Sequence, residues 1–381
     1  MMAQSHGNEW IDYSRIHVKV KVFQDGIHRV SYSTLQQAGL PVQTISPEAF
    51  RVYAREKEEP IWVSGADDGS FDFGDYIEFI GKKNNGWLDS LMYADPSGMG
   101  NPHYSLVNDT INYFITWDES NLGLRFDLEE DQNFAAYPTP NYITSRTGAV
   151  LSDDYCSGVL LSFDNRNTEF VRSEGWMGSR FGKGTGTLNR ELILQTPDVY
   201  TGSDAPSTSG KTRFASATNS SAGILPGNHH IQVFRGPNNE VQLADLIFSG
   251  YDLRNVDLNI PASELTSTLR LNYVVIDDLN IATDMFRIGF VELNYPRSKN
   301  FTTGNPYEIK VNANLAGSKY HLDLTGINYS APIVYVKGTH PYRLSHSSNK
   351  RLLAFRCSIS EGNLFFKCGC VTFRGRHLLL F

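Results

Sequence analysis

Short segments in which apolar and polar residues alternate dominate this sequence, and they constrain the fold more than any other feature. In residues 16–22 every second residue is Ile or Val, and the residues between are His or Lys. A period of two residues is typical of a β-strand with one face toward water. The other segments that predict strands lie at residues 50–53, 60–63, 75–80, 113–117, 192–194, 230–234, 241–248, 269–274, 286–293, 307–311, 319–324 and 333–336.

Helical periodicity is almost absent. Residues 33–39 predict one short helix, capped by Ser33 or Thr34 and ended by Gly39 before Pro41. Aromatic residues make up 12% of the chain and charged residues only 20%, a composition that suits half-buried sheets. Many strands separated by turns therefore predict a mostly β protein with a β-sandwich, jelly-roll-like, among its domains.

The length of 381 residues predicts two or three domains. Residues 121–150 are polar and contain two prolines, which indicates a linker or a crossing strand. The final segment holds three of the four cysteines, and we interpret it as an aberrant or truncated end, with a small Cys-rich tail as the alternative. The predicted divisions are a residual signal-peptide end at 1–7, an N-terminal β-rich domain with the helix at 8–120, the linker at 121–150, the β-sandwich at 151–298, the start of a third β unit at 299–355, and the tail at 356–381.

Charge and hydropathy limit the possible partners. The formal net charge is −7 and basic residues form no large cluster, which disfavours nucleic acid as a ligand. No apolar run approaches the roughly 20 residues that span a bilayer.

Met2-Ala3-Gln4 followed by polar residues is typical of the end of a secretory signal, which predicts export. An ordinary start of a cytosolic protein is the alternative.

Several segments occur in a characteristic order and spacing: Trp10, Asp25-Gly26-Ile27-His28-Arg29-Val30-Ser31-Tyr32, Phe50-Arg51-Val52-Tyr53, Gly74-Asp75-Tyr76-Ile77-Glu78-Phe79-Ile80-Gly81, and residues 260–265 and 291–297. Together these segments resemble the N-terminal region of PorU-like type IX secretion sortases, which belong to the gingipain family of cysteine peptidases. The resemblance covers residues 8–340. A further stretch, residues 172–178, agrees only in its Trp176-Met177-Gly178 end, because Arg172-Ser173-Glu174 stand where the family has Ser-Gly-Arg.

The resemblance implies that this chain is one region of a longer parent protein and that the catalytic residues lie in another region. In that family the catalytic His and Cys lie downstream of the β domains, so no catalytic residue can be assigned to this sequence. The parent would be a cysteine endopeptidase that removes C-terminal sorting domains from exported cargo at the outer-membrane surface. This region would supply a scaffold and a docking surface for secretion-system components and cargo. The alternative is a stand-alone exported adhesin or carbohydrate-binding β-sandwich protein.

Two tryptophans are candidates for partner docking. Trp87 follows Asn85-Gly86, and Trp176 follows Gly175, so both lie in turn-like settings. An exposed Trp can anchor an interface. A Trp folded beneath its own loop is the alternative for each.

Four carboxylates cluster in a short turn at Asp67, Asp68, Asp72 and Asp75. Calcium takes six to eight oxygen ligands, and such a loop can supply several of them, so we consider a weak calcium site. The spacing differs from that of a helix-loop-helix calcium site, and a solvated turn before a strand is the alternative. The sequence predicts no other cofactor.

Cys156 is the one cysteine outside the C-terminal segment. It stands at the head of the apolar run Val159-Leu160-Leu161, which indicates a buried structural thiol. The alternative, a nucleophile in a small hydrolase, requires an activating His and a third orienting group nearby.

Overall fold

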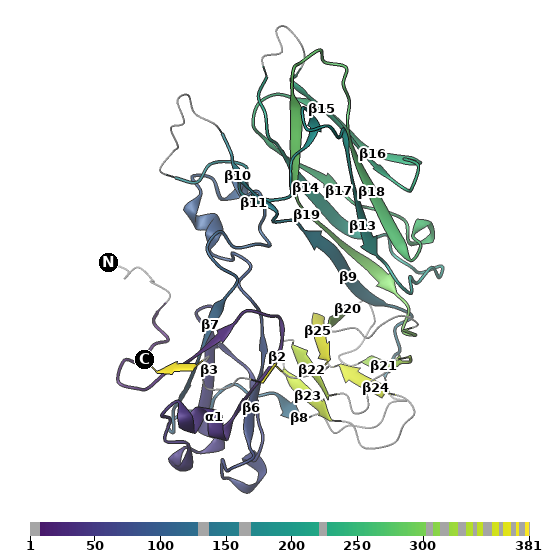
Figure 1. Ribbon diagram of the computed structural model, residues 1–381. Coiled ribbons are helices and arrows are strands. Elements are labelled where there is room, and N and C mark those ends of the chain that lie inside the picture. Colours follow the sequence, from purple (N-terminus) through teal and green to yellow (C-terminus); the bar gives the residue numbers. More distant parts are fainter. Residues whose placement is uncertain are drawn as a thin grey trace, which may run out of the picture. The chain divides into compact units, whose positions relative to one another are not determined.

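The computed structural model describes most of the chain in two compact units (Figure 1). One unit comprises Met1–Asn84, Asp109–Ile143 and Lys299–Phe381, and the other comprises Asn85–Asn108 and Thr144–Ser298. The fold is mostly β, as the sequence predicts, with one α-helix among the described residues. The described residues are 8–128, 137–159, 169–220, 227–301, 308–312, 320–326, 333–337, 341–345, 353–357, 361–366, 371–372 and 378–380.

The first unit contains two antiparallel β layers built largely from its N-terminal residues. One sheet has the order β27-β1-β7-β3-β4, and the other has the order β26-β2-β6-β5. Strand β26 joins β2 in parallel, whereas the other pairings in these two sheets are antiparallel. The strand bounds are β1 Val18–Val22, β2 Gly26–Ser31, β3 Phe50–Ala54, β4 Lys57–Glu59, β5 Ile61–Val63, β6 Tyr76–Gly81, β7 Ile111–Trp117, β26 Val371–Thr372 and β27 Leu378–Leu380.

A single apolar core lies between these two sheets. The alternating residues of β1 point into it, because Val18, Val20 and Val22 are fully buried. Helix α1 (Tyr32–Gln37) contributes Leu35 to the same core. The predicted helix is confirmed, but the predicted cap at Ser33 or Thr34 is wrong. Ser31 caps the helix by accepting a hydrogen bond from the backbone N–H of Thr34, so the helix begins slightly earlier than expected. Short 3₁₀ helices η1 (Val42–Thr44), η2 (Pro47–Ala49) and η3 (Ala66–Asp68) connect the strands.

The remaining strands of the first unit form a further sheet, in the order β20-β25-β22-β23-β8, and the pair β21-β24. Half of the predicted tail at 356–381, including Cys368 and Cys370, lies outside the described residues. The strand bounds are β8 Asp127–Leu128, β20 Glu308–Asn312, β21 Tyr320–Leu324, β22 Ile333–Lys337, β23 Tyr342–Ser345, β24 Leu353–Cys357 and β25 Glu361–Phe366.

The second unit is a jelly roll of two facing sheets. Its strands are ordered β17-β14-β19-β9 in one sheet and β13-β18-β15-β16 in the other. Counted along the chain without the short insertions β10 to β12, these are strands 6-3-8-1 and 2-7-4-5, the interleaved order of a jelly roll. The bounds are β9 Ile143–Val150, β13 Asn189–Gln195, β14 Ser209–Ser216, β15 His229–Arg235, β16 Val241–Phe248, β17 Leu253–Asp257, β18 Thr268–Val275 and β19 Asp284–Arg297.

Large apolar side chains from both sheets fill the jelly roll. Phe214 and Phe286 from one sheet meet Tyr273 from the other, and all three are fully buried. The Tyr273 hydroxyl lies 2.6 Å from the Thr212 hydroxyl, which in turn donates to the carbonyl oxygen of Phe290. The buried phenol is therefore hydrogen-bonded, as a polar group in a core must be.

Residues 85–108 lie within the predicted N-terminal domain at 8–120 but pack with the jelly roll. Arg213 donates a 2.7 Å hydrogen bond to the carbonyl oxygen of Met99, and the His103 ring meets the Phe290 ring edge-on at 4.5 Å. The domain boundaries remain a prediction. Strand β12 (Phe181–Lys183) pairs antiparallel with β19 at the side of one sheet. The elements outside the two main sheets are η4 Asp89–Met92, η5 Pro96–Gly98, β10 Asp154–Ser157, β11 Glu174–Met177 and η8 Ala262–Glu264.

Across the described ranges, every helix is too short or too polar to cross a membrane.

Candidate functional site

Trp87 lies on an exposed apolar surface in the second unit. Trp87 is 36% exposed, and the next residue, Leu88, and the apolar residues of η4 are exposed as well. We call this set the Trp87 surface, and its members with their exposed fractions are Trp87 (36%), Leu88 (43%), Leu91 (73%), Met92 (37%) and Val107 (73%).

A buried carboxylate holds the two parts of the Trp87 surface together. Asp89, only 7% exposed, accepts hydrogen bonds from the Ser105 hydroxyl at 3.0 Å and from the Leu106 backbone N–H at 2.6 Å. Gly86 has φ 77°, and a Cβ there would lie 2.9 Å from the Asp89 carboxylate. The turn that presents Trp87 therefore requires glycine, and the surface is fixed rather than loosely attached.

Trp176 has a different environment. It lies on β11, and its ring meets the rings of Tyr155 and Tyr104 edge-on, with centroid distances of 5.5 Å and 6.4 Å. Its backbone carbonyl accepts a hydrogen bond from the Asn101 side chain. The half-buried ring is thus part of the packing between β11 and residues 101–104. A docking role for Trp87 or Trp176 remains a prediction.

In the acidic turn predicted as a weak calcium site, two of the four carboxylates accept local hydrogen bonds. Asp68 accepts from the Ser70 backbone N–H at 2.9 Å, and Asp75 accepts from the backbone N–H of Asp72 at 2.8 Å. Asp75 also accepts from the Ser64 hydroxyl at 3.2 Å. Within the described segments, no three His, Cys, Asp or Glu side chains are placed to hold one metal ion. Calcium binding through Asp67, Asp68, Asp72 and Asp75 remains an untested prediction.

Cys156 is buried on β10, with 5% of its surface exposed. It packs with Met177, Ala215 and Leu253. Burial raises the pKa of the Cys156 thiol, which disfavours the thiolate that a nucleophile requires. The predicted structural role agrees with this environment.

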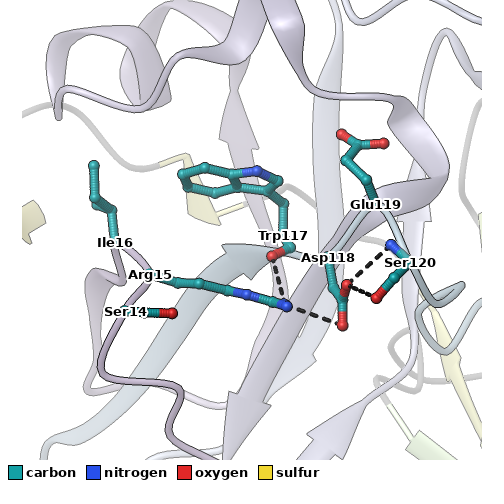
Figure 2. Close-up of a pocket in the computed structure, with 7 residues that line it drawn as sticks. All are labelled: Ser14, Arg15, Ile16, Trp117, Asp118, Glu119 and Ser120. Atoms are coloured by element: carbon teal, nitrogen blue, oxygen red, sulfur yellow. Dashed lines mark hydrogen bonds and ion pairs between the residues drawn. The ribbon is translucent and has the colours of Figure 1, made fainter.

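A pocket that no sequence motif indicates lies at the N-terminal end of β1, as Figure 2 shows. It has a volume of about 490 Å³ and lies where the chain entering β1 meets the chain leaving β7. Its wall combines an indole ring, an aliphatic side chain and several polar groups. The lining residues are Ser14, Arg15, Ile16, Trp117, Asp118, Glu119 and Ser120.

Two charged groups of this pocket, Arg15 and Asp118, are paired with each other. Arg15 donates to the carbonyl oxygen of Trp117 at 3.1 Å and forms a 3.0 Å ion pair with Asp118. Asp118 also accepts from the backbone N–H and the hydroxyl of Ser120, at 3.0 Å and 2.6 Å. The bonds from Arg15 and Ser120 hold the pKa of the Asp118 carboxyl far below its usual value. The pocket therefore offers the Trp117 and Ile16 side chains as contact surface beside this bonded pair.

Comparison with known proteins gives one informative result. No protein-family model matches the sequence, and no curated protein matches it. Among solved structures, the crystal structure of dimeric latent PorU from Porphyromonas gingivalis is similar over 93% of this chain, with a TM-score of 0.51 and 11% sequence identity. The matched region covers 32% of that PorU chain. At this identity the comparison shows a PorU-like fold, in agreement with the resemblance found in the sequence, and it shows the fold alone.

Proposed function

We propose that this chain is the non-catalytic scaffold and docking region of a type IX secretion sortase of the PorU kind. The observation that carries the proposal is the fold similarity to PorU, which extends over 93% of this chain but over only 32% of PorU. In this proposal a cysteine endopeptidase domain of a longer parent removes C-terminal sorting domains from exported cargo. The region would act outside the cell or at the outer-membrane surface, with secretion-system components and cargo as its partners.

The environment of Cys156 supports the non-catalytic part of the proposal. A cysteine peptidase needs an accessible thiolate activated by a histidine. Cys156 is buried in an apolar cluster, and burial raises its thiol pKa. The side chains of His229 and His230 are bonded to aspartates and not to a thiol.

The Trp87 surface supports the docking part of the proposal. Exposed aromatic and aliphatic side chains grouped on a fixed segment are typical of protein interfaces. Asp89 fixes the segment, so binding would not have to order it first. Because the surface is apolar, we expect the partner to offer apolar side chains.

A binding and cleavage assay tests both parts. We expect the purified chain to bind a C-terminal sorting domain of a type IX cargo protein saturably, by titration calorimetry, and to cleave no peptide bond in it. Trp87→Ala should weaken binding at least tenfold, because loss of an aromatic anchor typically costs about 2 kcal/mol. Leu122→Ala is the matched control, since Leu122 is 74% exposed in the other unit, and it should leave affinity unchanged.

Three outcomes would overturn the proposal in different ways. Absence of saturable binding to sorting domains would remove the docking role. Saturable binding on a glycan array instead would favour the alternative of a stand-alone carbohydrate-binding protein. Peptide cleavage that is abolished by Cys156→Ala would show that the chain carries its own active site.

A further inference from the structure

His230 lies between two carboxylates on the jelly roll. It belongs to β15, where Ile231 and Val233 point into the core. Its Nε2 is 2.7 Å from an oxygen of Asp245 on β16, and its Nδ1 is 2.8 Å from an oxygen of Asp278. Asp278 lies in the connection between β18 and β19, residues 276–283, which we call the β18–β19 connection. One imidazole therefore bridges a strand and a connection.

This geometry requires a doubly protonated ring. An ionised carboxylate can only accept hydrogen bonds, and a neutral imidazole has a single N–H to donate. Asp245 is further held as a carboxylate because Gln232 and Gln242 also donate to it, at 2.8 Å and 3.2 Å. Only the imidazolium form of His230 can donate to Asp245 and Asp278 at the same time.

The directions in which the pKa values of His230 and Asp245 are shifted agree with the hydrogen bonds between them. Burial lowers the pKa of His230, but hydrogen bonds to Asp278 and Asp245, together with the charges of these carboxylates, outweigh burial and leave that pKa raised. The bond from His230 is the first cause of the lowered pKa of Asp245.

The other charged groups around His230 are not bonded to its imidazole ring; their side chains have other partners. Asp284, at the start of β19, accepts from the backbone N–H of His230 at 3.0 Å and is bonded to the Nδ1 of His229 at 2.6 Å. Asp277 of the connection forms a 2.7 Å ion pair with Lys183 on β12. Among the described residues, His230 is thus the group whose loss of a proton would break the bond to Asp278.

The β18–β19 connection has its own contacts beyond Asp278. The backbone N–H of Ile276 donates to the carbonyl oxygen of His230 at 3.0 Å. At the other end, the Ser220 hydroxyl lies 2.7 Å from the Thr283 hydroxyl and donates to the Thr283 carbonyl.

We propose that His230 is a proton-operated latch that holds the β18–β19 connection against the β15–β16 hairpin. When the ring loses a proton, one of the two carboxylates faces a lone pair and must leave. Asp278 leaves, because Asp245 is part of a paired strand and keeps its bonds to Gln232 and Gln242. The latch is closed at pH values below the ordinary histidine pKa, about 6.5, and opens as the pH rises through the raised pKa of the folded protein.

Two measurements on the full chain test the latch. The first is the NMR titration of the His230 ring, which should have a midpoint above about 6.5, the ordinary value. The second is amide hydrogen exchange of residues 276–283, corrected for the intrinsic effect of pH on exchange. We expect protection of these amides to fall about tenfold across the His230 midpoint, which corresponds to about 1.4 kcal/mol.

Variants identify the residues responsible. Asp278→Asn should lower the His230 midpoint and remove the step in exchange, and His230→Gln should leave protection low at every pH. Asp257→Asn, an exposed acid on β17, is the matched control and should leave both measurements unchanged. A His230 midpoint at or below the ordinary value, or equal protection on both sides of the midpoint, would overturn the proposal. If His230→Gln does not fold, Asp278→Asn still decides the question.

Discussion

Glu78 offers the sharpest test of how the first unit is held together. Its side chain is fully buried on β6 and accepts two hydrogen bonds from Arg29 of β2, at 2.9 Å and 2.7 Å. It also accepts from the hydroxyl of Tyr335 on β22, which is itself fully buried. One carboxylate therefore joins a strand near the N-terminus to a strand more than 250 positions later.

The substitution Glu78→Gln keeps the size of the side chain but removes its charge. The amide has one acceptor oxygen, so its NH₂ group faces donors on Arg29 or Tyr335. Breaking a buried ion pair by removing one partner typically costs about 3–5 kcal/mol. The Arg29 side chain is 28% exposed and can recover part of its hydration. We therefore expect a loss near the lower end of that range, about 3 kcal/mol.

Hydrogen exchange with mass spectrometry measures the loss of stability at β2, β6 and β22 separately from the rest of the chain. The chain has two compact units, so a global melt would combine two transitions. Peptides covering β2, β6 and β22 should exchange about 100-fold faster in Glu78→Gln, the equivalent of about 3 kcal/mol. Peptides covering β13 and β18 in the jelly roll are the internal reference and should not change.

Two controls separate charge burial from general damage. Tyr335→Phe removes one donor and leaves the Arg29–Glu78 pair intact, so we expect a loss of only about 1 kcal/mol. Glu191→Gln breaks the Glu191–Arg270 pair, in which both side chains are about 40% exposed, and should cost less than about 1 kcal/mol. Equal effects of Glu78→Gln and Glu191→Gln, or unchanged protection of β22 in Glu78→Gln, would refute this reasoning.

Two further predictions concern the second unit. Cys156 should react with a water-soluble thiol reagent at least 100-fold more slowly in the folded chain than in urea, because it is buried and its thiol pKa is raised; rapid labelling of the folded chain would contradict the structural role. Asp89→Asn should destabilise residues 105–107 by about 1–2 kcal/mol, measured as faster amide exchange there, because the Ser105 and Leu106 donors lose a charged acceptor. The exposed Asp109→Asn serves as the control, and an equal effect of both substitutions would exclude a specific role for Asp89.

The strands and the helix could be predicted because their signals are local. The alternating burial in β1 is set by residues within that one strand. The helix between Ser31 and Gly39 is set by residues within a few positions of each other. The packing of residues 85–108 on the jelly roll could not be predicted in this way. Its contacts, such as Arg213 with the carbonyl of Met99, join residues 114 positions apart and leave no periodic trace in the sequence.

The candidate sites show the same limit. Turn residues around Trp87 and Trp176 are alike in the sequence, but the two rings differ in the structure because Tyr104 and Tyr155 pack against Trp176 alone. The sequence shows two adjacent histidines at 229 and 230. It does not show that His230 pairs with Asp245 and Asp278, because these aspartates come from other elements. Side-chain environments of this kind depend on sheet order, which the alternation of residues does not specify.

The residues that carry the sequence resemblance to PorU-like sortases prove to be structural neighbours. Residues 25–32 and 74–81 contain β2 and β6, which pair antiparallel, with Gly26 opposite Gly81. A Cβ at Gly81 would lie 2.1 Å from the ring of His28, which is 1% exposed, so this position has room only for glycine. The same pair of strands carries the Arg29–Glu78 bond. These residues are therefore required by the packing of two strands, and the resemblance reports the fold, which agrees with structural similarity to PorU at only 11% identity. It follows that Glu78→Gln should loosen the packing of β2 against β6, the two strands that carry much of the resemblance.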